Sequence, residues 1–159
     1  MYHLRRKDKE IIDQSEIKKI LKSCRYVTLA MSFNDKPYLV TLNHGFDEKN
    51  NCIYFHCAAE GRKIEILKKN PIVWGQAFID LGYQKGECEH HYESVQFEGK
   101  VSFVEGKNEK HKAIKFLIEQ LEDEPDKVLD NHFKTSLERL NKIKMGKIDI
   151  TFLSGKRNI

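Results

Sequence analysis

The sequence has no long run of apolar residues. A transmembrane helix needs about 20 consecutive apolar residues, and no segment of the 159-residue chain approaches that length. The first residues, Met1 to Arg5, lead into charged residues instead of the apolar stretch of a secretory signal. We therefore expect a soluble protein of the cytoplasm that makes no membrane contact.

Neither sign of charge dominates the composition. The 28 Lys and Arg residues are mixed with 24 Asp and Glu residues, and the formal net charge is +4. Proteins that bind nucleic acids usually gather their basic residues on one face or along one helix. The short cluster Arg5-Arg6-Lys7 is interrupted by Asp8 and Glu10. We interpret it as a solvated tail and expect no nucleic-acid partner.

The four cysteines, Cys24, Cys52, Cys57 and Cys88, include no C-x-x-C pair of the kind found in zinc sites. Cys52 and Cys57 are an odd number of positions apart. On one regular strand their side chains would point to opposite faces and share neither a metal ion nor a disulfide. We expect reduced thiols with structural roles.

Several catalytic and architectural signals are also missing. The sequence contains no G-x-G-x-x-G motif, so a nicotinamide cofactor would bind only transiently. It shows no Ser-His-Asp arrangement of the kind used for hydrolysis. No internal repeat, low-complexity tract or linker divides the chain. We therefore expect a single domain over residues 1–159, with enough bulk for a hydrophobic core.

The segment over residues 52–71 is the most informative part of the chain. It begins with a β-rich apolar run, Ile53-Tyr54-Phe55, which predicts a strand. Glu60-Gly61 then interrupts this pattern, and Ile64 and Leu67 recur at helical spacing until Asn70-Pro71 ends the helix. A short helix is therefore expected just after a strand.

Arg62 and Lys63 fall in the first turn of this helix. Their charges oppose the helix dipole, whose N-terminus is already positive. Free backbone N–H groups, a positive dipole end and two adjacent cations together suit a phosphate. The spacing alone is equally compatible with two ordinary surface charges.

Hydrophobic periodicity predicts strands and helices in the rest of the chain. We expect helices at 13–23, 113–121 and 129–140, strands at 26–33, 38–46, 72–79, 93–104 and 143–152, a turn at 34–37 and a loop at 80–92. Gly99 is expected at a bulge or close approach, and Gly146 at a bulge. With the strand that begins at Cys52, six short and mostly antiparallel strands predict a mainly β fold, a small closed or split β-barrel with peripheral helices.

Several segments, in this order along the chain, resemble one family. They are Pro37–Asn43, Ile53–His56, Glu60–Lys63, Asn70-Pro71, Cys88, Tyr92–Val95, Phe97–Lys100 and Leu153–Arg157. Together they resemble the pyridoxamine 5′-phosphate oxidase-like family, and in particular its nitroimidazole-reductase-like branch. The resemblance spans nearly the whole chain in the right order.

This resemblance implies an FMN-binding split β-barrel that assembles as a homodimer, with flavin at the subunit interface. It implies that Arg62 and Lys63 hold the FMN phosphate. It also implies that the strand Thr41-Leu42-Asn43 lies along the isoalloxazine ring, largely through its backbone. Ser94 would lie near the flavin, and His56 beside it.

The sequence departs from the oxidases of this family at two positions. Leu39 and His44 stand near strand positions where oxidase members carry basic residues, and the substrate-binding C-terminal residues of those oxidases are not evident. We therefore expect a generic flavin reductase and not an enzyme that oxidises pyridoxamine phosphate.

Other residues allow a functional and a structural interpretation. His56 also suits a hydrogen-bonded histidine at the edge of the core, and His44 is ambiguous in the same way. Cys88, His90 and His91 carry groups that ligate metals or haem. Their spacing fits no regular site, which favours a solvated loop and no metal. Trp74 suits the core or an interface.

The sequence thus predicts a flavoprotein oxidoreductase. It would bind FMN and pass reducing equivalents from a nicotinamide cofactor to a small acceptor, with the flavin supplying the redox chemistry. No catalytic acid or base is assigned. The alternative is a non-catalytic flavin- or haem-binding protein on the same barrel.

Overall fold

The computed structural model describes residues 5–135 and 143–159. In chain order its elements are the 3-10 helix η1 (Lys7–Lys9), β1 (Glu10–Ile11), α1 (Gln14–Ser23), β2 (Tyr26–Phe33), β3 (Lys36–Asn43), β4 (Gly45–Asp47), β5 (Cys52–Ala58), α2 (Arg62–Lys69), β6 (Ile72–Gln84), β7 (Glu89–Val104), α3 (Lys107–Leu121), α4 (Pro125–Thr135) and β8 (Ile143–Asn158).

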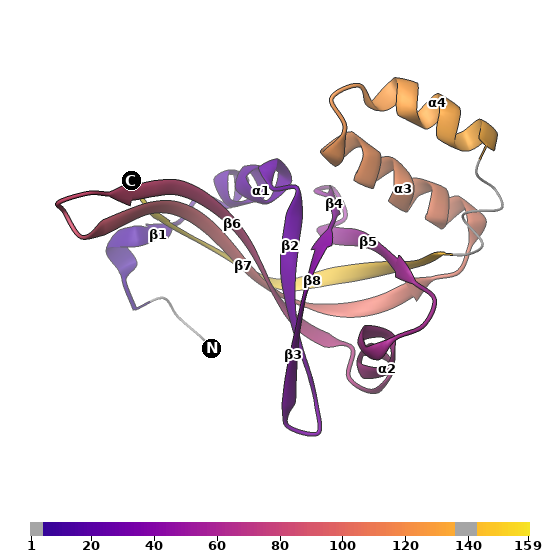
Figure 1. The fold of residues 1–159 in the computed structure, drawn as a ribbon, viewed down its shortest axis with the longest axis horizontal. Coiled ribbons are helices and arrows are strands. Elements are labelled where there is room, and N and C mark those ends of the chain that lie inside the picture. The colour runs from indigo at the N-terminus through magenta and orange to yellow at the C-terminus, as the bar shows by residue number, and fades with distance from the viewer. Residues whose placement is uncertain (1–4, 136–142) are drawn as a thin grey trace.

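The described strands form one sheet in the order β3-β2-β6-β7-β8-β5-β4, with β1 beside β8. Every pairing between these strands is antiparallel. The terminal strand β3 also contacts β5, so the sheet curls into a barrel that stays split near its two edges. Figure 1 shows the helices around the outside of this sheet. The predicted mainly β barrel with peripheral helices is confirmed.

The predicted loop over residues 80–92 is wrong. β6 runs to Gln84 and β7 begins at Glu89, and the two strands form a hairpin that projects from the barrel (Figure 1). Positive φ angles at Gly86 and Cys88 (90° and 53°) make the tight turn between them. Because most side chains of this arm are exposed, it lacks the apolar alternation from which a half-buried strand is recognised.

The turn between β2 and β3 is shorter than predicted. Asn34 and Asp35 have φ values of 51° and 58°, the combination that a two-residue hairpin turn requires. Pro37 falls within the predicted turn, but it belongs to β3 and pairs with Ser32. β3 is a sheet edge, where the missing N–H of a proline costs little. The predicted strand 38–46 also breaks at His44, because β4 turns away to pair with β5.

The two predicted irregularities have different outcomes. The pairing of β7 with β8 shifts register between Glu98 and Gly99, which leaves Thr151 as the extra residue of a bulge, so the prediction at Gly99 is confirmed. Gly146 pairs regularly with Phe55 and with Phe103, so the bulge predicted there is wrong. A Cβ at Gly146 would overlap the ring of Phe55, and this close packing explains the glycine.

Two apolar clusters explain why apolar residues occur on both faces of β8 although Gly146 forms no bulge. Ile148 packs in the main cluster inside the barrel, whereas Met145 packs in a second cluster beneath α3. Both faces of this strand are therefore buried, and apolar residues need no slip to appear on both parities. Cys57 and Cys52 likewise fall in the first and second cluster, which confirms that they point to opposite faces.

The helix α3 lies against the outside of β4 and β5. The ring of Tyr54 stacks on Phe116 with centroids 5.9 Å apart. A Cβ at Gly45 would collide with the backbone of Phe116, so only glycine permits this approach. α3 begins six residues before the predicted 113, and α4 begins four residues before the predicted 129; the predicted residues 136–140 lie outside the described residues. No helix among the described residues is long and apolar enough to cross a membrane.

Candidate functional site

The N-terminus of α2 is built as a concentration of positive charge. Gly61 precedes the helix with φ 125°, a conformation that residues with a side chain rarely adopt, and no side chain caps the first turn. Arg62 is exposed, with its guanidinium 5.6 Å from the centre of the Tyr38 ring, and Lys63 is half-buried. The buried side chains of Ile64 and Leu67 pack in the main cluster and hold the helix in place.

The charges at α2 differ from those of a second polar site with two lysines. A polar cavity of about 500 Å³ near β5 and α3 also contains two lysines, Lys112 and Lys147. Lys112 lies 2.7 Å from Asp47, and Lys147 lies 2.7 Å from Asp149, so their charges are already neutralised. Among the ion pairs between described residues, none includes Arg62 or Lys63. The donor set at α2 therefore fits a phosphate better.

The predicted residues of β3 lie on the edge strand of the sheet. Thr41 and Asn43 are exposed on its outer face, and Leu42 points inward against the main cluster. The Thr41 hydroxyl lies 3.0 Å from that of Thr28, and the Asn43 amide donates to the carbonyl of Arg25 at 3.1 Å. Because β3 ends the sheet, its free edge offers backbone groups to a ligand.

Ser94 lies on β7 and is buried. Its hydroxyl donates to the carbonyl of Lys156 at 3.3 Å. Ser94 pairs with Phe78 and with Lys156, so it lies on the outer face of the sheet, as Thr41 does. Within one chain, β2 and β6 separate it from β3.

His56 lies near the end of β5 and is exposed, on the face that carries Tyr54. It borders a cavity of about 360 Å³ whose other lining residues come from α3, α4 and β8. Within one chain, the residues predicted to bind flavin therefore lie at three separate places: the start of α2, the outer face of the sheet, and the cavity beside α3.

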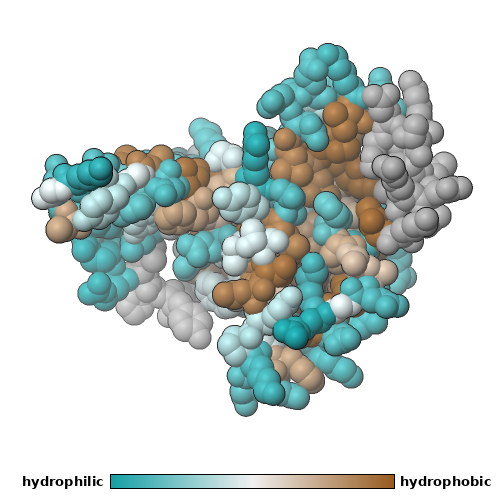
Figure 2. Space-filling model, viewed as in Figure 1, coloured by the Kyte–Doolittle hydropathy of each residue, from teal (hydrophilic) through white to brown (hydrophobic). Residues whose placement is uncertain are grey.

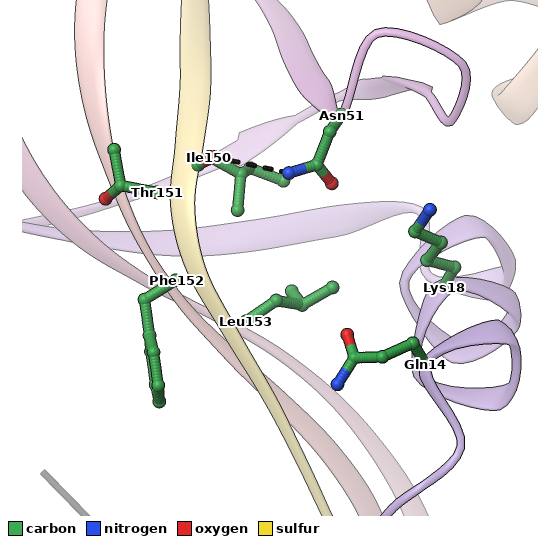
Figure 3. A pocket seen from close by; sticks show the side chains of 7 residues that line it. All are labelled: Gln14, Lys18, Asn51, Ile150, Thr151, Phe152 and Leu153. Atoms are coloured by element: carbon green, nitrogen blue, oxygen red, sulfur yellow. Dashed lines mark hydrogen bonds between the residues drawn. The ribbon is translucent and has the colours of Figure 1, made fainter.

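A shallower hollow of about 320 Å³ lies at the β8 bulge, between that strand and α1. Figure 3 shows its lining, Gln14, Lys18, Asn51, Ile150, Thr151, Phe152 and Leu153. Asn51 donates to the carbonyl of Ile150 at 3.2 Å and closes one side (Figure 3). Lys18 alone supplies positive charge here, so this hollow fits a phosphate less well than the start of α2 does.

The residues of the β6–β7 hairpin are kept apart by the strand geometry. His90 lies 2.8 Å from Asp80, and His91 lies 3.3 Å from Gln84. Successive strand residues point to opposite faces, so the two imidazoles do not converge. Cys88 is exposed in the turn. In the part of the chain that the structure describes, no three His, Cys, Asp or Glu side chains are grouped so that they could hold a metal ion.

His44 has a structural place that its sequence context did not indicate. It is fully buried, and its Nε2 lies 2.8 Å from the Gln120 amide nitrogen and 3.2 Å from the Leu21 carbonyl. The same Gln120 accepts from the Phe46 N–H at 2.8 Å. This network ties α1, α3 and β4 together. Burial lowers the pKa of His44 to about 4, so the imidazole is neutral at pH 7.

The outer face of the sheet is the feature that sequence reasoning largely missed. Cross-strand pairing aligns an uncharged row made of Thr41, Thr28, Gln76, Gln96 and Ser154. A neighbouring row contains Leu39, 64% exposed, the half-buried Glu98, and the rings of Trp74 and Phe152, whose centroids lie 5.8 Å apart. The alternation Trp74, Gln76, Phe78 was the available signal, but β6 alone did not show which strands lie beside it.

Comparison with known families places this fold. A family model described as pyridoxamine 5′-phosphate oxidase matches residues 13–157. The chain belongs to the pyridoxamine 5′-phosphate oxidase family. The family predicted from sequence motifs is therefore confirmed. Comparison with curated proteins gives no match.

Solved structures agree with this family. A candidate 5-nitroimidazole antibiotic resistance protein from Bacteroides thetaiotaomicron is 26% identical, with a TM-score of 0.77 over 93% of this chain and 86% of that one. A flavocytochrome from Azotobacter vinelandii is 13% identical, with a TM-score of 0.78 over 99% and 73%. An FAD-binding protein from Mesorhizobium loti is 23% identical, with a TM-score of 0.63 over 93% and 96%. The last two are similar in fold.

Proposed function

We propose that this member of the pyridoxamine 5′-phosphate oxidase family binds FMN and uses it as an oxidoreductase. The observation that supports this most directly is the start of α2, where Gly61 supplies no side-chain cap, and Arg62 and Lys63, which no ion pair between described residues includes, suit a phosphate. The similarity to a candidate nitroimidazole resistance protein supports a reductase acting on a small acceptor.

The bound flavin would supply hydride and electron transfer, and the residues of this chain would bind and orient it. Arg62 and Lys63 hold the phosphate. The free edge of β3 at Thr41, Leu42 and Asn43 lies along the ring through backbone groups, with His56 and Ser94 as further contacts. A nicotinamide cofactor binds transiently against the flavin, in agreement with the missing dinucleotide motif.

We further propose that the flavin lies between two copies of this chain. The outer sheet face is uncharged along one row. The next row carries Leu39, Trp74 and Phe152, with the half-buried Glu98 paired to both Trp74 and Phe152. On this face Leu39, Phe78 and Phe152 are between 36% and 64% exposed. Exposed apolar side chains gathered on one face are typical of a protein interface. A two-fold partner on this face would bring Ser94 and Trp74 of one copy close to the residues of the other copy that bind the flavin. Within one chain, Ser94 and those residues lie apart.

A dilution series tests this assembly. The change Leu39→Glu places a charge on the face proposed as the interface, and we expect it to weaken dimerisation at least about tenfold because that charge would be desolvated. FMN should tighten dimerisation of the unchanged protein, since a ligand that prefers the dimer stabilises it by mass action. Sedimentation velocity with and without FMN measures both.

The matched control is Ile12→Glu, since Ile12 is 85% exposed and lies outside this face. It should leave the association constant unchanged. A monomer that keeps full FMN affinity contradicts the shared site.

The absorption spectrum of freshly purified protein tests the function itself. We expect flavin bands, and bleaching of these bands when NADH or NADPH is added without oxygen.

The second candidate is a non-catalytic flavin- or haem-binding protein. It is favoured by the fold similarity to a flavocytochrome and to a protein from Mycobacterium smegmatis described as binding FAD and haem, with a TM-score of 0.75 at 11% identity. A haem Soret band, or a flavin that neither nicotinamide reduces, would support it instead.

A further inference from the structure

A cavity of about 360 Å³ lies beside α3, apart from the phosphate site proposed at the start of α2. Most of its lining is apolar and comes from three elements; these residues are Ile114, Leu117, Ile118, Leu121, Val128 and Ile143. His56 and Glu122 are the polar residues among the described lining. Figure 2 shows hydrophobic surface gathered around α3. A concave apolar site of this volume with few polar groups is typical of small-molecule binding.

The polar groups give this cavity a negative rim. Glu122 follows the last turn of α3, and its N–H donates to the Ile118 carbonyl at 3.0 Å. The last turn contains no basic residue, so the partial negative charge of the helix C-terminus is not offset there. Lys127 lies 2.7 Å from Glu124, whereas no ion pair between described residues includes Glu122. A cation at the rim would therefore be stabilised.

The geometry points to a site for a small amphipathic amine. We propose that its aromatic or aliphatic body lies among the side chains of α3, α4 and β8. Its ammonium group lies at the rim, where it pairs with the Glu122 carboxylate beside the His56 ring. The cavity corresponds to about 12 non-hydrogen atoms if each takes the ~30 Å³ of a water molecule. This binding requires no flavin.

Three probes of similar shape test the charge preference. Tryptamine, the alcohol tryptophol and indole-3-propionate are titrated calorimetrically into the full chain, both flavin-free and flavin-loaded. We expect tryptamine to bind at least about fivefold more tightly than tryptophol, because it adds a charged hydrogen bond. Indole-3-propionate should bind most weakly, because its carboxylate would face the carboxylate of Glu122. Equal affinities, or a preference for the acid, would overturn the proposal.

Variants of α3 test the location. Ile118→Trp fills the cavity and should weaken tryptamine at least about tenfold. Glu122→Gln should reduce tryptamine to the affinity of tryptophol and leave tryptophol unchanged. The control Glu119→Gln lies on the same helix, where Glu119 is 3.6 Å from Lys115 and does not line the cavity, and should change neither.

Amide shift mapping on the unchanged protein keeps the location testable if Ile118→Trp does not fold. Tryptamine should shift the resonances around Ile114, Leu121 and His56. Shifts confined to another face, or binding that survives in a folded Ile118→Trp protein, would place the amine elsewhere and end this assignment. Because the titration also uses flavin-free protein, its result is separate from that of the flavin experiment.

Discussion

The double change Arg62→Ala and Lys63→Ala should lower the affinity for FMN at least about 100-fold. Each side chain supplies a charge-assisted hydrogen bond, worth roughly 1.5–3 kcal/mol, to a dianionic phosphate, so the pair contributes roughly 3–6 kcal/mol. Both residues lie in the first helical turn, where no side chain caps the backbone N–H groups. Fluorescence titration of the apoprotein with FMN measures the loss.

Riboflavin and a second double variant separate this effect from a general loss of charge. Riboflavin lacks the phosphate, so it should bind poorly to the unchanged protein and equally poorly to the Arg62→Ala and Lys63→Ala variant. The change Lys68→Ala with Lys69→Ala removes the same charge from the other end of α2 and should leave FMN affinity within about twofold, since these lysines lie in the last turn. If the first variant binds FMN as the unchanged protein does, the phosphate is held elsewhere.

Acidification from pH 6.5 to pH 4 should lower the free energy of unfolding by about 3 kcal/mol through His44 alone. Burial lowers the pKa of this histidine from 6.5 to about 4 in the folded protein. Over this range the unfolded chain binds a proton that the folded one excludes. The stabilising contribution is therefore complete above pH 6.5 and is lost as the pH falls to about 4. Urea unfolding at a series of pH values measures it.

Carboxylates contribute little to the upper part of this window. The carboxyls of Asp13, Asp47 and Asp80 have pKa values lowered from 3.8, so their contributions are lost mainly below pH 4. Hydrogen bonding to Asn158 lowers the pKa of Glu89 from 4.5, so its contribution begins to be lost just above pH 4 and adds to the lower end of the window. His44→Leu should flatten the dependence between pH 6.5 and pH 4 while lowering stability at pH 7, since the Gln120 network is broken. The control His91→Gln, in the hairpin, should keep the slope. A flat profile in the unchanged protein would contradict a buried neutral His44.

The sequence determined those features whose cause is local. The run over residues 52–71 specifies strand, glycine break and helix from its own periodicity, and the structure has β5 and α2 in those places. The helix predicted from residue 13 is α1, and Asp13 caps it by accepting the Ser15 N–H at 2.8 Å, a contact between residues two apart in sequence. The adjacent charges of Arg62 and Lys63 needed only the helix start to be placed correctly. The motifs that resemble the family occur in the same order along the chain, and this order was enough to predict the split β-barrel fold.

Only the tertiary structure decided what depends on neighbours distant in sequence. β6 extends to Gln84 and β7 begins at Glu89 because each strand satisfies the backbone of the other. Gly146 is regular because Phe55, from another strand, fills the space above it. His44 is buried because Gln120 reaches it from α3, and His56 borders a cavity made by α3, α4 and β8. Periodicity reports how one element meets its surroundings, whereas these contacts depend on which elements the folded sheet brings together.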